Sequence, residues 1–175
     1  MKKIILLLFF CLLLTGCIQK ITSLPGLNKN QTANQALAVA KKEALKYAGD
    51  AYLVDGYSLT STSGKTYADG TSQTWYFKFI SPSKNEKFRL DVEQGKVTEI
   101  KNNDGTATIG TKLPDQFADS DQVAKAVKPH CTATEEGKYF YNLTDDKWSV
   151  KCVNAEKGEI SINVDFNGQF LKIRD

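Results

Sequence analysis

The sequence predicts an α+β fold in which a helix packed on an antiparallel sheet occurs twice, after an N-terminal targeting segment. Each half begins with a helix-capping signal, each helix is followed by alternating strands, and the two halves align at an offset of 73 residues. We therefore divide the chain into a leader (1–16), a tether (17–31), a first unit (32–101), a linker (102–116) and a second unit (117–175).

The leader has the pattern of a bacterial export signal. Two lysines precede an apolar run from Ile4 to Leu14, which is too short to cross a hydrocarbon layer that requires about 20 helical residues. Thr15 and Gly16 then stand directly before Cys17. This order resembles the bacterial lipoprotein signal, in which diacylglycerol is attached to the cysteine thiol and a peptidase cuts just before it. An ordinary cleaved secretion signal is the alternative, but small residues before a cysteine favour lipidation.

The resemblance implies that Cys17 becomes the lipidated first residue of the mature chain and anchors it to a membrane. Two or three acyl chains, palmitate among them, hold a protein firmly, whereas one chain does so only marginally. Ile18 follows the cysteine where an aspartate would act as a retention signal in some two-membrane bacteria. We therefore expect a protein on the cell membrane or outer membrane that faces the periplasm or the exterior.

The composition argues against a nucleic-acid partner. Without the leader and its two lysines, 21 basic residues face 20 acidic ones, which is a formal charge of about +1. Lysines alternate with acids throughout the mature chain, in contrast to the basic stripes that bind phosphate backbones. The charge pattern is that of a solvated protein surface.

The first unit begins with a capping-box pair, Thr32 and Gln35, which is followed by apolar residues at helical spacing as far as Gly49. Alternating strands come next, and the Gln94–Gly95 pair predicts a tight turn into a third strand. The expected inward-facing strand residues are Trp75, Phe77, Phe79, Phe88, Leu90 and Val92.

The second unit repeats this order. Asp119 and Gln122 give the same capping signal, and Pro129 is expected to end or kink a shorter helix. The Asn167–Gly168 pair predicts the turn into the last strand. The expected inward-facing strand residues are Trp148, Val150, Cys152, Ile160, Ile162 and Val164.

Cys131 and Cys152 remain for an oxidising exterior once Cys11 leaves with the leader and Cys17 takes the lipid, so we expect them to form a disulfide. Closing a loop of about 20 residues contributes about 3 kcal/mol in the chain-entropy model. Cys152 stands where the first unit has Phe79, so the bond would replace an aromatic contact between helix and sheet. A free or metal-binding pair is the alternative, but neither a CxxC spacing nor a ligand cluster supports it.

The run from Val164 to Phe170 has an apolar, acidic, turn-glycine pattern, and residues 92–97 contain a shorter version of it. This pattern, after a helix and an antiparallel meander, resembles the PepSY domain of bacterial exported proteins. The resemblance implies two tandem PepSY-like (cystatin-like) units, 32–101 and 117–175. PepSY modules are associated with the propeptides of secreted peptidases, where inhibitory or chaperone roles have been suggested, and with envelope proteins. The resemblance assigns no catalytic residue or cofactor to this chain.

The inventory of catalytic side chains is small. His130 is the sole histidine of the sequence and lies between Pro129 and Cys131 at a helix end, where a structural or solvent-facing role is expected. Most hydrolytic mechanisms require a positioned base, a nucleophile or a metal cluster. We therefore expect a protein that is not an enzyme and that has no cofactor or metal.

The distance from the helix cap to the tryptophan is 43 residues in the first unit (Thr32 to Trp75) and 29 in the second (Asp119 to Trp148), a difference of 14, which is the length of the segment 61–74. This segment is rich in Ser, Thr and Gly, and we expect it to form a mobile surface loop or an exposed hairpin. Its candidate binding residues are Gly64, Tyr67, Asp69 and Gly70. A tolerated insertion without a role is the alternative.

These observations favour a lipid-anchored, non-enzymatic envelope protein whose repeated modules bind another exported protein, such as a peptidase. The first alternative is a structural or assembly subunit of the envelope without a discrete ligand. A hydrolase that depends on His130 or an acidic residue is the second alternative.

Overall fold

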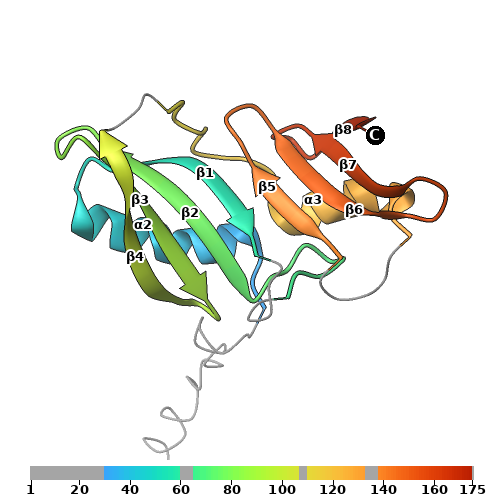
Figure 1. Ribbon diagram of the computed structural model, residues 1–175, viewed down its shortest axis with the longest axis horizontal. Coiled ribbons are helices and arrows are strands. Elements are labelled where there is room, and N and C mark those ends of the chain that lie inside the picture. Colours follow the sequence, from blue (N-terminus) through green and yellow to red (C-terminus); the bar gives the residue numbers. More distant parts are fainter. Residues whose placement is uncertain (1–29, 60–64, 107–109, 133–137, 175) are drawn as a thin grey trace, which may run out of the picture.

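The computed structural model describes residues 30–59, 65–106, 110–132 and 138–174, with the side chains of 103–106 excepted. One helix followed by four strands occurs twice along this part of the chain (Figure 1). The elements are α2 (Ala33–Tyr47), β1 (Tyr52–Ser58), β2 (Thr74–Ser81), β3 (Glu86–Glu93), β4 (Lys96–Thr106), α3 (Ser120–Val127), the 3₁₀ turn η1 (Lys128–His130), β5 (Phe140–Leu143), β6 (Trp148–Asn154), β7 (Gly158–Val164) and β8 (Phe170–Arg174).

All eight strands belong to a single antiparallel sheet in the order β4-β3-β2-β1-β5-β6-β7-β8. The predicted α+β class and the antiparallel pairing are confirmed. The sequence predicted two tandem helix-on-sheet units without a pairing between them. In the structure β1 pairs with β5 and joins the two meanders, with Gly56 opposite Leu143 and Tyr57 opposite Asn142. This pairing satisfies backbone groups of two strands that would otherwise be exposed edges.

Both helices lie on the same face of the sheet (Figure 1). The core fills the space between the helices and the sheet. The strand residues that were expected to face inward are buried there. Trp75 and Trp148, at the start of β2 and β6, are among the largest fully buried side chains. The period-two pattern therefore identified the helix-covered face of β2, β3, β6 and β7.

Both helices begin as predicted. Thr32 with Gln35 and Asp119 with Gln122 form complete capping boxes. The buried side of α2 consists of alanines, which lets the helix axis approach the aromatic residues of the sheet closely. Pro129 ends α3 by directing the chain into the 3₁₀ turn η1.

An equivalent hydrogen bond fixes the start of each helix. The indole Nε1 of Trp75 donates to the carbonyl oxygen of Gln31 at 2.8 Å, and that of Trp148 donates to the carbonyl oxygen of Ala118 at 3.0 Å. Each acceptor directly precedes the N-cap of its helix. Each tryptophan therefore fills the core and also anchors the chain where its helix begins.

Parts of the expected tether and linker belong to the fold. Gln31 is buried, and its backbone bridges to Ser72. The strand β4 continues to Thr106, beyond the expected end of the first unit at residue 101. Leu113 is buried, and its N–H donates to the carbonyl oxygen of Leu53 at 2.9 Å.

The two halves meet at a seam, which consists of the β1–β5 pairing, the first turns of α2 and α3, and the segment 65–73. The Oδ1 of Asp119 accepts from the N–H of Ser120 at 2.7 Å and from the N–H of Asn34 at 2.9 Å. The hydroxyl of Ser120 accepts from the N–H of Ala33 at 2.8 Å. The N-cap region of α3 thus satisfies free N–H groups of α2 as well as its own.

The segment 65–73 closes the seam on the helix side. It is a tight hairpin with a Thr66–Ser72 bridge, and both of these side chains are buried. Gly70 adopts a φ of +87°, and a Cβ built there would lie 2.1 Å from the carbonyl oxygen of Ser120. A mobile surface loop or an exposed hairpin was expected for 61–74. Residues 65–73 do form a hairpin, but Thr66, Gly70 and Ser72 are buried in the seam; residues 61–64 lie outside the described residues.

Replacing Asp119 with alanine is expected to lower the free energy of unfolding by about 2–3 kcal/mol, because two helices lose an acceptor for their first turns. Thr32→Ala, which removes a cap from α2 alone, is the matched control and should cost about 1 kcal/mol. Urea unfolding followed by circular dichroism measures both. Equal losses in the two variants would contradict the shared cap.

Replacing Gly70 with alanine is expected to lower the free energy of unfolding by about 3 kcal/mol or more, because the added methyl group collides with the backbone of Ser120. Gly158→Ala separates this collision from backbone strain, since Gly158 has a similar φ of +75° but no atom within 4 Å of the added Cβ. That control should cost about 1 kcal/mol. Comparable losses in urea unfolding would show that the packing at Gly70 is unimportant.

Candidate binding surface

None of the described helices lies over the second face of the sheet (Figure 1). We call it the open face. Strand register places one row of side chains across all eight of its strands, and the central pairs in that row are Tyr76–Tyr57 and Tyr57–Asn142. The full row is Glu99, Asp91, Tyr76, Tyr57, Asn142, Ser149, Asn163 and Lys172.

Three aromatic rings lie together at the centre of the open face, and we call Tyr57, Tyr76 and Phe140 the aromatic cluster. The ring of Tyr57 on β1 lies 5.1 Å from that of Tyr76 on β2 and 6.1 Å from that of Phe140 on β5. Each ring is half-buried. Because Phe140 belongs to the second half of the sheet, the cluster crosses the seam.

Two cations cover this cluster. The Nζ of Lys78 lies 5.3 Å from the centre of the Tyr57 ring, and the guanidinium carbon of Arg89 lies 4.4 Å from the centre of the Tyr76 ring. Both distances suit cation–π attraction, which is worth about 0.5–1 kcal/mol at exposed sites. Lys78 also pairs with Asp55 at 2.9 Å.

Asp91 is the most buried charged group of the open face, with 5% of its surface exposed. Arg89 donates to its two oxygens from Nε at 2.7 Å and from Nη2 at 3.0 Å. Burial raises the pKa of Asp91 above its usual value, although Arg89 opposes the rise. This forked ion pair fixes the guanidinium over the Tyr76 ring.

The arrangement is suited to binding. Tyrosine and arginine side chains that are held by neighbours and still partly exposed are the residues that contribute most affinity in protein interfaces. Burial raises the pKa of Tyr76 above that of a free phenol, so its hydroxyl stays protonated at neutral pH. The cluster therefore presents aromatic surface and hydroxyl groups beside two cations that are each paired with a carboxylate.

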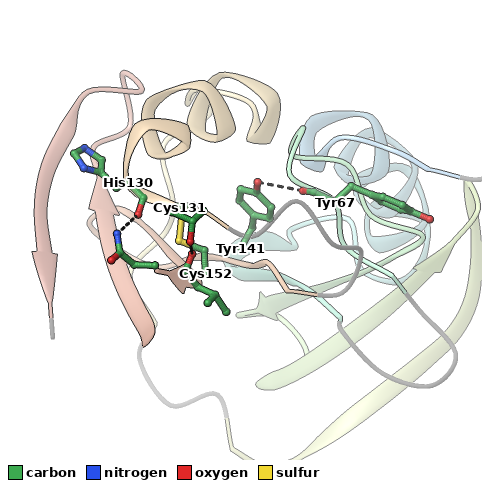
Figure 2. Close-up of a disulfide and its surroundings, with 8 residues drawn as sticks. Tyr67, His130, Cys131, Tyr141 and Cys152 are labelled. Atoms are coloured by element: carbon green, nitrogen blue, oxygen red, sulfur yellow. Dashed lines mark hydrogen bonds between the residues drawn. A yellow bond between two sulfur atoms is a disulfide. The ribbon is translucent and has the colours of Figure 1, made fainter. Parts of the chain in front are cut away.

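Cys131 and Cys152 lie at disulfide distance, with Cα atoms 5.8 Å apart (Figure 2). The bond joins the end of η1 to β6 on the helix-covered face. At the equivalent position of the first half, Phe79 stacks on Phe88, and Phe88 contacts Tyr47 at the end of α2. The disulfide thus stands where the first half has an aromatic contact between sheet and helix.

The candidate residues of the segment 61–74 have different surroundings. The carbonyl oxygen of Tyr67 accepts from the hydroxyl of Tyr141 at 3.3 Å, which ties the segment to β5 (Figure 2). Asp69 is exposed and accepts from Thr71 within its own turn, whereas Gly70 is buried. Gly64 lies outside the described residues, as does Cys17. A binding role for these positions stays a prediction.

His130 is half-buried and stacks on Phe170, with ring centres 4.6 Å apart. Its ring points away from the disulfide, while its carbonyl oxygen accepts from Asn154 (Figure 2). Within the described ranges, three or more His, Cys, Asp or Glu side chains nowhere gather as they would around a metal ion. The described helices also include none with the length and apolar character needed to cross a membrane.

No protein-family model matches the sequence, so the PepSY resemblance is not confirmed. No curated protein matches it either. Among solved structures, the chain is similar to a crystal structure described as a "putative lipoprotein" from Clostridium difficile 630. The two share 19% sequence identity with a TM-score of 0.55, over 82% of this chain and 91% of that one. At this identity the likeness concerns the fold.

The open face was missed by the sequence reasoning because β1 was not predicted. Asp55 and Gly56 interrupt its alternation, and the register shifts between Leu53 and Asp55. Without β1, Tyr57 had no assigned place beside Tyr76. One sequence pattern could have indicated the open face. Tyr76, Lys78 and Arg89 alternate with the inward-facing residues of β2 and β3, so a second face with aromatic and basic groups was predictable.

Asp91 should make stability depend on pH with a defined sign. Because its folded-state pKa is raised, its stabilising contribution is present below the usual value of 3.8 and is lost as pH rises through the folded-state pKa. The free energy of unfolding of the wild type, minus that of Asp91→Asn, is therefore expected to fall across a window that begins near pH 3.8.

Asp50→Asn is the control with the opposite sign. A hydrogen bond from Ser81 lowers the pKa of Asp50, so its contribution is present above pH 3.8 and is lost as pH falls through the folded-state pKa. The corresponding difference should therefore rise with pH. Urea unfolding at a series of pH values measures both slopes. A rising difference for Asp91→Asn would contradict the assignment.

Proposed function

We propose that this chain is a lipid-anchored, non-enzymatic envelope protein that binds another exported protein through its open face. The aromatic cluster carries the proposal. Its three rings lie at the centre of the open face and remain partly exposed, and Lys78 and Arg89 hold the two tyrosine rings. Such pre-ordered side chains lose little conformational entropy when a partner packs on them.

The anchor and the partner class rest on the sequence. Cys17 has the lipoprotein-like context, and the described fold is similar to that of a protein described as a putative lipoprotein. The PepSY-like pattern at 164–170 favours a secreted peptidase as the partner. The recurrence of one helix and four strands supports the view that 32–101 and 117–175 are PepSY-like repeats.

A structural or assembly role is the second candidate, and it is favoured by the last edge of the sheet. The edge strand β8 exposes Phe170 and Leu171, with 42% and 51% of their surfaces accessible. An edge strand with exposed apolar residues can pair with another chain. Such assembly would produce self-association without a discrete ligand.

Photo-cross-linking in intact cells tests the two candidates. A photoreactive phenylalanine in place of Phe140 is expected to capture a specific exported protein, while the same probe at Lys42, exposed on α2, should not. Capture should be lost in a folded Tyr57→Ala chain. A Cys17→Ser chain should lose both the membrane anchor and the capture.

Two outcomes would contradict binding through the open face. The first is equal capture from Phe140 and Lys42, which would mark unspecific contact. The second is exclusive capture of a second copy of the chain, which would favour the structural role. Circular dichroism of each variant establishes that it is folded before the comparison is made.

A further inference from the structure

The second half of the open face gathers hydrogen-bond donors from β6, β7 and β8. Asn163 on β7 lies opposite Ser149 on β6 and opposite Lys172 on β8, and Ser161 lies opposite Arg174. The hydroxyls of Ser149 and Ser161 are 3.0 Å apart, so these two side chains point to the same place. We call these five residues the donor group.

Asn163 is the unusual member. It is 2% exposed, and its Nδ2 has no hydrogen-bond partner. Buried amide donors are almost always paired, because an unpaired one loses its hydration without replacement. A buried asparagine in the middle of a polar strand face therefore indicates an acceptor that is not part of the described chain.

The charge around Asn163 determines what kind of acceptor fits. Lys172 and Arg174 are exposed, and neither forms an ion pair with a carboxylate of the described residues. Glu159, the acid of β7, faces Lys151 at 3.7 Å. Lys172 and Arg174 place two positive charges beside the buried amide, so an anion gains an attraction there that a neutral water molecule does not.

We propose that the donor group binds a phosphate group. A tetrahedral phosphate accepts hydrogen bonds in several directions, which suits an amide, two hydroxyls, an ammonium and a guanidinium that come from three strands. Arginine matches phosphate with two parallel donors, and lysine adds a mobile point charge. The site is separate from the aromatic cluster on β1, β2 and β5, so it does not depend on the proposed function.

Calorimetric titration of the full-length lipidated protein in neutral detergent with inorganic phosphate tests the proposal. Saturable one-to-one binding is expected, with at least tenfold weaker affinity for Lys172→Gln/Arg174→Gln and for Asn163→Leu. Lys87→Gln, which removes a cation from the other half of the open face, is the control and should bind like the wild type.

The variants at Lys172 and Arg174 change exposed side chains, so their test does not depend on refolding a core. Absence of saturable binding, or equal weakening by Lys87→Gln, would overturn the site. Vesicles of phosphatidylglycerol and of phosphatidylcholine distinguish the source of the phosphate. Selective binding to phosphatidylglycerol that inorganic phosphate competes away supports a lipid headgroup, whereas binding of inorganic phosphate alone supports a soluble phosphate.

Discussion

The Asp119 carboxylate is the point on which the two halves of this molecule depend. It accepts hydrogen bonds from the first turn of α3 and from the first turn of α2. Two helix N-termini that meet would repel each other through their positive dipole ends, and a carboxylate between them converts this repulsion into attraction. Because the tryptophan of each half fixes the residue just before its own N-cap, the position of the helices determines how the two meanders approach.

The open face depends on the same contact. β1 and β5 pair through few residues. The continuity of the sheet therefore relies on the other parts of the seam, which are the first turns of the two helices and the segment 65–73. The aromatic cluster takes Tyr57 from one half and Phe140 from the other. A surface built in this way exists only while the halves are joined. Tyr141 illustrates the link, since its N–H donates to the hydroxyl of Ser58 and its own hydroxyl donates to Tyr67.

Local rules accounted for much of the fold. The capping boxes at Thr32 and Asp119, the turn at Gln94–Gly95 and the inward tryptophans follow from short-range patterns, which a sequence records directly. The pairing of β1 with β5 and the packing of Gly70 on Ser120 are contacts between residues far apart in the chain, and no local pattern encodes them. The same limit hid the candidate site, because a face that crosses the seam becomes visible only when the strand order is known.

The two halves hold their helices against the sheet by different contacts, aromatic in the first half and covalent in the second. The two kinds of contact form under different conditions. The ring contacts among Phe79, Phe88 and Tyr47 form wherever the chain folds, whereas the link between Cys131 and Cys152 requires an oxidant. In a reducing compartment the first half would already have its full set of contacts while the second half lacked its covalent one. The second half therefore gains its full set of contacts only where an oxidant is available.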